Sequence, residues 1–254
     1  MFRDIYIAFM VFARTFGAYQ IFFLRLLRHT PAVLFTRFPL VVRQVYNAGA
    51  LSLVIIMISG TFVGGVMALQ GIDILSLFDA EEAVGMFAAF ALIKELSPVV
   101  TALLFSGRAG TALASEIGLM KATDQLAAME MMAVNPVKRV VVPRFIGGII
   151  AMPLLTAVFS AVGMLGAHLV AVTLMDVDVG AFWQQIQLTV EMEDVMEGVY
   201  KSIVFGIVAS SLAVFEGYNA IPTAEGVGRA TTRTVVLSSI AVLILDFMIT
   251  AALL

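Results

Sequence analysis

The sequence predicts an all-α membrane protein with five transmembrane helices. Of its 254 residues, 61% are hydrophobic and only 13% are charged, whereas soluble domains are about 25% charged. The apolar runs are long and continuous, which disfavours a barrel of short alternating strands. The composition also excludes disordered and coiled-coil proteins, and the net charge of −3 argues against a nucleic-acid binder.

Five apolar runs reach the length of about 20 residues that a helix needs to cross a bilayer. They are residues 45–72, 83–106, 145–175, 199–215 and 234–254. The third run is longer than a straight crossing needs, and Pro153 offers a kink. Lys94 and Glu95 interrupt the second run, Lys201 lies near the start of the fourth, and the fifth carries Asp246.

Lys and Arg residues alternate between the segments that flank the spans. Successive segments carry six, none, five, none and two of them, counted over residues 1–44, 73–82, 107–144, 176–198 and 216–233. Basic residues accumulate on the cytoplasmic side of a membrane. The pattern therefore predicts a cytoplasmic N-terminus and a C-terminus on the other side. We expect a single domain over residues 1–254, with all five spans within residues 45–254.

The N-terminal region, residues 1–44, is predicted to form an interfacial amphipathic helix. Arg3, Arg14 and Arg25 recur every 11 residues, which is three helical turns, and Arg28 falls near the same stripe. A basic face turned toward anionic headgroups suits a helix that lies in the membrane plane. The alternative, a sixth span, would bury Arg14 in hydrocarbon and break the charge alternation.

Lys94 and Glu95 lie in the middle of the second run, where an unpaired charge costs several kcal/mol. Two interpretations stay open: a polar patch in a central cavity, where Lys94 meets an anionic headgroup, or ion pairs that hold helices together. Adjacent helical residues point about 100° apart, so these two are not expected to pair only with each other. Lys201 either extends its ammonium outward or pairs with Glu197, four residues earlier, or else it lines an outer vestibule.

Other residues in the apolar runs are expected to serve helix packing. His168 in the third run should contact a neighbouring helix, and Asp246 in the fifth should form a packing hydrogen bond. Gly60 and Gly64 permit close approach of another helix and fit a dimer contact.

The connection at residues 107–144 is the predicted docking site for a partner protein. A helix is expected over residues 123–134, because apolar residues recur there with helical spacing and Asn135-Pro136 ends the pattern. Three methionines within positions 129–132 give a soft apolar surface that can enter a groove. The residues expected at this contact are Glu116, Asp124, Met129 and Glu130.

No catalytic or metal-binding motif appears in the sequence. It contains no P-loop, no H-E-x-x-H and no Cys, and the predicted topology keeps its two His residues apart. We therefore expect a chain that is not an enzyme and holds no metal or cofactor. Its energy would come from a partner or from an ion gradient.

Two long segments, residues 91–145 and 217–236, resemble the MlaE (YrbE) permease family. They read ALIKELSPVVTALLFSGRAGTALASEIGLMKATDQLAAMEMMAVNPVKRVVVPRF and GYNAIPTAEGVGRATTRTVV. The members of this family are membrane subunits of lipid ABC transporters associated with MCE-domain proteins. The likeness is closest to the Gram-negative Mla branch, which maintains outer-membrane lipid asymmetry. It implies an interfacial helix plus five spans in the bacterial inner membrane, with a periplasmic C-terminus.

The resemblance also implies a set of partners. The permease would be a homodimer, and each copy would contact a cytoplasmic ABC ATPase through residues 107–136. That ATPase would bind ATP and magnesium, together with a small STAS-domain protein. A hexameric MCE-domain protein would cover the periplasmic side, and the substrate would be glycerophospholipid.

The resemblance further implies a lipid pocket at the dimer axis, between the outer end of the first span and the second span. The lipid-binding positions would be Met67, Ile74, Leu75, Phe78, Lys94, Glu95 and Lys201. Gly71 and Asp73 are expected to end or bend the first span among them. The family often has Arg where this chain has Lys94; Lys keeps the charge but lacks the bidentate fork.

Other functions stay open at this level. A self-contained secondary transporter or channel would use Lys94, Glu95 and Asp246 as an ion path, but such folds usually carry an internal repeat and none is visible. A membrane scaffold for the partner of residues 107–144 would hold no specific lipid. Within the family, sterol-like substrates are an alternative to phospholipid.

Overall fold

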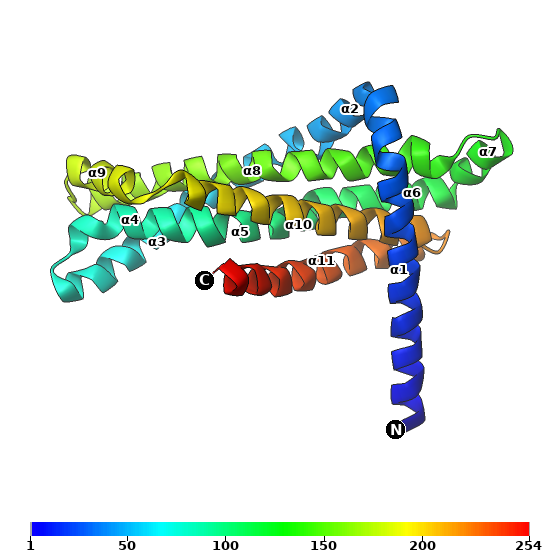
Figure 1. Cartoon of the computed structure of the whole chain (residues 1–254), viewed down its shortest axis with the longest axis horizontal. Helices are drawn as coiled ribbons and strands as arrows, with labels where there is room; N and C mark the ends of the chain where they lie inside the picture. Colours follow the sequence, from blue (N-terminus) through cyan, green and yellow to red (C-terminus); the bar gives the residue numbers. More distant parts are fainter. Residues whose placement is uncertain (1, 254) are drawn as a thin grey trace.

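The computed structural model describes the backbone of residues 2–253 and the side chains of residue 10 and residues 13–253, and every regular element in it is helical (Figure 1). The α-helices are α1 (Phe2–Thr36), α2 (Phe38–Ala48), α3 (Leu53–Leu75), α4 (Val84–Phe90), α5 (Ser97–Phe105), α6 (Thr111–Ala122), α7 (Gln125–Met131), α8 (Val142–His168), α9 (Val179–Thr189), α10 (Met192–Asn219) and α11 (Ala224–Leu253). Short 3₁₀ and π-helical segments join them: η1 (Ala50–Ser52), η2 (Ser76–Phe78), η3 (Glu81–Ala83), η4 (Ala91–Leu96), η5 (Ser106–Gly110), η6 (Val137–Val141) and η7 (Leu169–Leu174).

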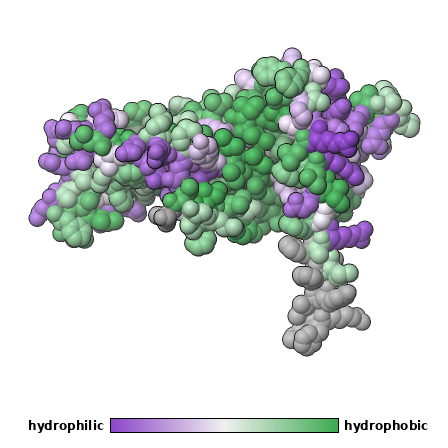
Figure 2. Space-filling model, in the orientation of Figure 1, coloured by the Kyte–Doolittle hydropathy of each residue, from purple (hydrophilic) through white to green (hydrophobic). Residues whose placement is uncertain are grey.

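Within the described residues, five helical rods are long and apolar enough to cross a membrane. They comprise Phe38–Phe78, Glu81–Ala122, Val137–Leu174, Met192–Asn219 and Ala224–Leu253. Each contains the apolar run predicted for it, to within one residue at its end, so the prediction of five helices able to span a membrane is confirmed. Figure 2 shows a hydrophobic band across the bundle with hydrophilic surface gathered toward its two ends.

The connection predicted at residues 107–144 is much shorter than expected. The second rod continues through η5 and α6 to Ala122, and the third begins at Val137. Hydropathy falls after residue 106, but the helical hydrogen bonds continue because α6 is rich in good helix formers. Only residues 123–136 connect the rods, and they hold α7 within the predicted range of 123–134. Arg108 therefore lies in a helix, where its Nη1 donates to the carbonyl oxygen of Asn47 at 2.7 Å.

The sequence predicts that the first span ends or bends at Gly71 and Asp73, but the helix continues through both residues. Helix α3 runs through both residues to Leu75, and the chain turns only at Asp79, whose φ is 52°. Gly71 is buried, and a Cβ added to it would lie 2.8 Å from Cδ1 of Phe87. The glycine thus allows α4 to approach α3 rather than breaking the helix.

Helices α3 and α8 are in glycine-mediated contact within the chain. A Cβ on Gly60 would lie 3.1 Å from the carbonyl oxygen of Phe159, and one on Gly64 would overlap the carbonyl oxygen of Gly163. Likewise, a Cβ on Gly166 would overlap the carbonyl oxygen of Thr61. The Gly60 and Gly64 pair is therefore occupied by α8 of the same chain, which replaces the dimer contact expected from the sequence.

Helix α1 runs across one end of the bundle (Figure 1). Its middle is anchored there, because the Tyr19 hydroxyl lies 2.6 Å from Ser211 Oγ of α10, and Leu26 is fully buried. The predicted region of 1–44 is divided, since α2 begins at Phe38 and belongs to the first membrane rod.

The basic and acidic connections lie at opposite ends of the bundle. The end that α1 crosses also holds α7 and the turn between α10 and α11, whereas the turn from α3 to α4 and helix α9 lie at the other end (Figure 1). The segments in which six, five and two basic residues were counted thus all reach this end, although Arg108 lies within the second rod. This arrangement matches the charge alternation on which the topology was predicted, and the cytoplasmic location of that end stays a prediction.

Replacing Gly64 with Ala should destabilise the protein by about 1–3 kcal/mol, because the methyl group would push α3 away from α8. The matched control is Gly228→Ala in α11, where nothing lies within 4 Å of the added carbon. That variant should be neutral or more stable by about 0.5–1 kcal/mol. Thermal unfolding of the purified proteins in one detergent compares them. Equal unfolding transitions would contradict the close α3–α8 contact.

Candidate functional site

The candidate site is built around the π-helical segment η4 in the second rod. This segment places Lys94 and Glu95 beside α10. Pro98 has no backbone N–H, so the carbonyl of Lys94 loses the donor that a regular helix would give it. The ammonium of Lys201 takes that place and donates to the Lys94 carbonyl oxygen at 3.1 Å. The helix defect is thus satisfied by a side chain from a neighbouring rod, as a membrane-embedded helix requires.

Lys201 is fully buried, and its Nζ is surrounded by oxygen atoms. Besides the Lys94 carbonyl, it contacts Glu95 Oε1 at 2.8 Å, Thr250 Oγ1 at 2.9 Å and Glu197 Oε1 at 3.1 Å. A buried ammonium is tolerated only when carboxylates and further acceptors replace its water. Lys201 therefore joins the second, fourth and fifth rods at one point.

Lys94 extends this cluster toward the surface. Its Nζ lies 2.9 Å from Asp194 Oδ1 and 3.1 Å from Glu197 Oε2, and 5.7 Å from the centre of the Phe90 ring. Glu197 therefore bridges the two lysines with its two oxygens. We call these five residues the charged cluster: Lys94, Glu95, Asp194, Glu197 and Lys201. Its two cations and three carboxylates sum to a formal charge of −1.

The local sequence of α10 explains how the cluster forms. Asp194, Glu197 and Lys201 recur at helical spacing and so share one face of the helix. Gly198 lies on the same side, and a Cβ there would overlap the carbonyl oxygen of Ile93. The absent side chain lets α10 come close enough to η4 for these ion pairs to form.

A cavity of about 520 Å³ opens beside the charged cluster. Its walls combine apolar side chains with a charged rim: Leu75, Phe87, Phe90, Lys94, Glu95 and Glu197. The side chains of Lys94 and Glu95 are 31% and 39% exposed, so both can reach a ligand in this cavity. An apolar wall below groups of both charges suits an amphiphilic molecule with a charged head.

The structure brings some of the predicted lipid-binding residues together and separates others. Leu75, Lys94 and Glu95 line the cavity, whereas Lys201 lies behind it without exposed surface. Ile74 and Phe78 are exposed at the end of the first rod and do not line the cavity, and Met67 also lies outside it.

Both sequence interpretations of the charged residues apply in part. Ion pairs do link the helices, and Lys201 does pair with Glu197, while Lys94 and Glu95 also face a cavity. Sequence reasoning missed Asp194 and Thr250 as partners, because nothing local relates them to the second span.

The two smaller packing expectations have different outcomes. His168 packs as expected, with its ring centre 5.4 Å from those of Phe182 and Trp183 in α9. Asp246 differs, because its buried Oδ1 has no hydrogen-bond partner within the described structure. Among the same residues, no group of three His, Asp or Glu side chains is placed to hold a metal ion.

The predicted coupling residues lie at the end of the bundle that holds α7, in unequal environments. Glu116 Oε2 lies 3.0 Å from Arg144 Nη2, an ion pair that ties α6 to α8. Asp124 precedes α7 in a left-handed conformation and is exposed, as is Glu130. Met129 is partly buried against the core, while two further methionines stand out from the surface: Met131 and Met132.

Comparison with known proteins finds one matching family model, described as Permease MlaE, over residues 41–252. The chain is 50% identical over 215 residues to the "Intermembrane phospholipid transport system permease protein MlaE" of Haemophilus influenzae, covering 84% of this chain and 82% of that protein. It is 36% identical over 211 residues to a "Probable ABC transporter permease protein" of Rickettsia typhi, covering 83% and 82%. It is 28% identical over 209 residues to the chloroplast protein TRIGALACTOSYLDIACYLGLYCEROL 1 of Arabidopsis thaliana, covering 82% and 60%.

Replacing Lys201 with Leu should destabilise the protein by about 3–5 kcal/mol, because it removes the buried cation that Glu95 and Glu197 share. The double variant Lys201→Leu, Glu95→Leu should regain part of this loss, since the orphaned charge is also removed. Lys138→Leu, at an exposed position, is the control and should have little effect. Thermal unfolding in detergent measures all three. A double variant less stable than Lys201→Leu alone would contradict the assigned pairing.

Proposed function

The chain belongs to the MlaE permease family, and we propose that it is the membrane subunit of an ABC transporter that moves glycerophospholipids between the bacterial inner membrane and a periplasmic carrier. The observation that carries this proposal is the 50% identity, over most of both chains, to a protein named as an intermembrane phospholipid transport permease. In this role the chain contributes to the maintenance of outer-membrane lipid asymmetry.

The cavity beside the charged cluster is the proposed lipid site. An apolar wall such as that of Leu75, Phe87 and Phe90 lets acyl chains leave the bilayer without the cost of roughly 0.8 kcal/mol per CH₂ that exposure to water would impose. Lys94 is the cation best placed to meet a headgroup phosphate, because it is partly exposed while Lys201 is enclosed. In this proposal, Lys201 positions Glu95 and Glu197 and does not touch the lipid.

The end of the bundle that holds α7 is the proposed contact for a cytoplasmic ABC ATPase. The exposed Met131 and Met132 offer apolar surface for a groove, with Asp124 and Glu130 beside them. The ion pair between Glu116 of α6 and Arg144 of α8 would couple a displacement of α7 to the second and third rods. ATP and magnesium would be bound by that ATPase, which would also carry the STAS-domain protein.

The remaining partners are proposed at the other surfaces. A second copy of the chain would pack beside the cavity, where α11 leaves apolar side chains such as Ile244 and Phe247 exposed. A hexameric MCE-domain protein would cover the end formed by α9 and the turn from α3 to α4, and would receive or deliver the lipid.

Reconstitution of the chain with its ATPase in vesicles tests the proposed function. Labelled phospholipid should move to an added periplasmic carrier only when ATP is supplied. ATP-independent transport by the chain alone would instead favour a secondary transporter. Retention of sterol rather than phospholipid by the purified complex would redirect the substrate assignment.

Replacing Leu75 with Asp should lower the phospholipid retained by the purified complex about tenfold or more, because an unpaired carboxylate would face the acyl chains. Leu75→Met should retain lipid. Leu77→Asp is the matched control, since Leu77 lies two residues away, is 78% exposed and does not line the cavity. Mass spectrometry of extracted lipids provides the measurement. Equal lipid in the two Asp variants would place the lipid elsewhere.

Replacing Glu130 with Lys should abolish copurification of the ATPase and leave the amount of chain in the membrane unchanged. The change inverts an exposed charge outside the hydrophobic rods, so folding has no reason to fail. Glu82→Lys inverts an exposed charge near the opposite end and should leave the complex intact. Affinity purification followed by an ATPase assay reads out both variants. An undiminished yield of complex with Glu130→Lys would remove this residue from the interface.

A further inference from the structure

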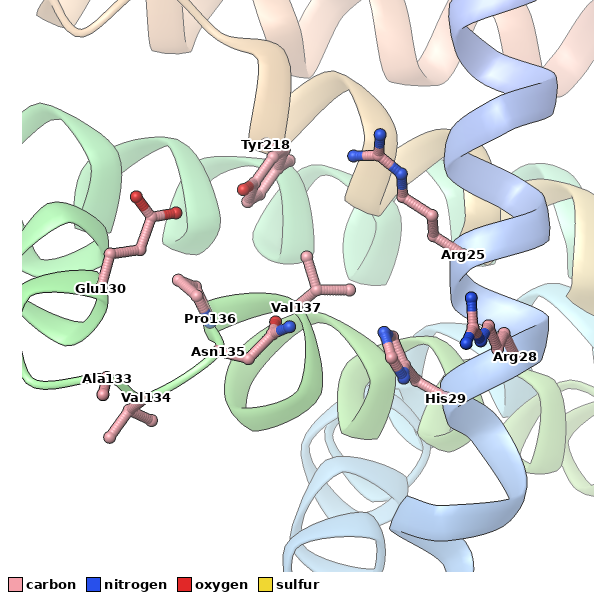
Figure 3. A pocket seen from close by; sticks show the side chains of 10 residues that line it. All are labelled: Arg25, Arg28, His29, Glu130, Ala133, Val134, Asn135, Pro136, Val137 and Tyr218. Atoms are coloured by element: carbon pink, nitrogen blue, oxygen red, sulfur yellow. The ribbon is translucent and has the colours of Figure 1, made fainter.

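A second cavity, of about 550 Å³, lies at the end of the bundle that α1 crosses, away from the charged cluster. Figure 3 shows the side chain of Arg25 extending from α1 toward Tyr218 and that of His29 extending toward the connection between α7 and α8, with Arg28 beside them on α1. Asn135 faces them from that connection, and Tyr218 of α10 closes another side. The cavity is therefore an open hollow bordered by three parts of the chain that meet only in the folded protein.

The electrostatic character of this cavity is positive. Arg25 and Arg28 form no salt bridge within the described part of the chain, and Glu130 is the one acidic residue among those lining the cavity. Burial, followed by the charges of Lys138 and Arg28, lowers the pKa of His29 below its usual value. Two guanidinium groups thus stand almost without counter-charge in a concave site.

Neutral donors complete the cavity lining. The backbone N–H of Lys138 donates to Asn135 Oδ1 at 3.2 Å, which leaves the amide NH₂ of Asn135 as the group free to donate to a ligand. The Tyr218 hydroxyl supplies another donor. Guanidinium groups bind phosphate oxygens in bidentate geometry. The chemistry that fits this set of donors is a phosphate group.

The surroundings point to a lipid as the source of that phosphate. Val134 and Val137 form apolar parts of the wall. Next to the arginines, α1 exposes Ile21, Leu24 and Leu27, which would contact acyl chains if α1 lies in the headgroup plane. We propose that this cavity binds the phosphate of an anionic phospholipid headgroup from the leaflet that holds α1. The bound lipid would fasten α1 to the bundle. The proposal does not depend on the transport function.

The test measures lipid retention by the full chain with a variant and a matched control. The variant Arg25→Gln, Arg28→Gln removes both guanidinium groups from the cavity. The control Arg14→Gln, Arg43→Gln removes the same charge from exposed positions outside it. Each protein is placed in nanodiscs of phosphatidylcholine with a minor fraction of phosphatidylglycerol. Native mass spectrometry then gives the phosphatidylglycerol that stays bound.

The cavity variant should retain about tenfold less phosphatidylglycerol than the wild-type chain, as expected for lost charge-assisted hydrogen bonds, and the control should retain nearly all of it. Equal losses in the two double variants would mean that general surface charge attracts the lipid, which overturns the proposal. Unchanged retention of phosphatidylglycerol in the cavity variant would overturn the proposal as well, even if that variant no longer bound the ATPase.

Two further measurements separate the remaining outcomes. Asn135→Asp keeps the acceptor for the Lys138 N–H but replaces the amide donor with a negative charge, so this variant should also lose phosphatidylglycerol. It provides the test of the cavity should the double arginine variant fail to fold. Normal retention in Asn135→Asp would overturn the proposal. Inorganic phosphate is then added to the wild-type chain. Binding of inorganic phosphate without binding of phosphatidylglycerol would identify free phosphate as the ligand and overturn the lipid assignment.

Discussion

The buried ammonium of Lys201 constrains the arrangement of the membrane rods more than any other single group. In a medium of low dielectric constant it must keep oxygen acceptors on every side, and it finds them on three rods: the Lys94 carbonyl and Glu95, Glu197 of its own helix, and Thr250. Meeting that demand sets the separation of η4, α10 and α11. The cavity is therefore shaped by a residue that has no surface in it.

Pro98, Gly198 and Lys201 act together in this arrangement. The proline frees a carbonyl, the glycine allows α10 to approach η4, and the lysine satisfies the freed carbonyl. Each would be unfavourable alone, because the proline removes a helical hydrogen bond, the glycine removes a packing side chain and the lysine buries a charge. Together they expose Lys94 and Glu95 to the cavity, next to its apolar wall. Helices α3 and α8 also pack closely because glycines lack side chains at their contact and so let the two backbones meet.

The two ends of the bundle carry different chemistry. The end that holds α7 combines basic residues, exposed methionines and a cavity beside α1 lined by two arginines, which suits contacts with a protein partner and with anionic headgroups. The other end is acidic and lies near the open side of the charged cluster. If α1 is held by lipid and α7 by the ATPase, the same end of the molecule senses both the membrane and nucleotide hydrolysis.

The sequence by itself determined the class of protein, the number of spans and the segregation of basic from acidic connections. These properties depend on composition and on residues near one another in the chain, such as the apolar runs and the alternation of Lys and Arg. It also singled out Lys94, Glu95 and Lys201 as unusual, because a charge in an apolar run is visible without a structure. Helix ends were less accurate, since hydropathy falls at the membrane boundary while α6 continues to Ala122.

Only the tertiary structure decided which residues those charges meet. Asp194 and Thr250 are about 100 and 155 residues away from Lys94 and Glu95, and their pairing depends on how three rods pack. The same holds for Gly64, whose partner is α8 of the same chain, and for the cavity that Arg25 shares with Asn135. Contacts between distant segments depend on the shapes of whole helix surfaces, and no local pattern of residues records those shapes.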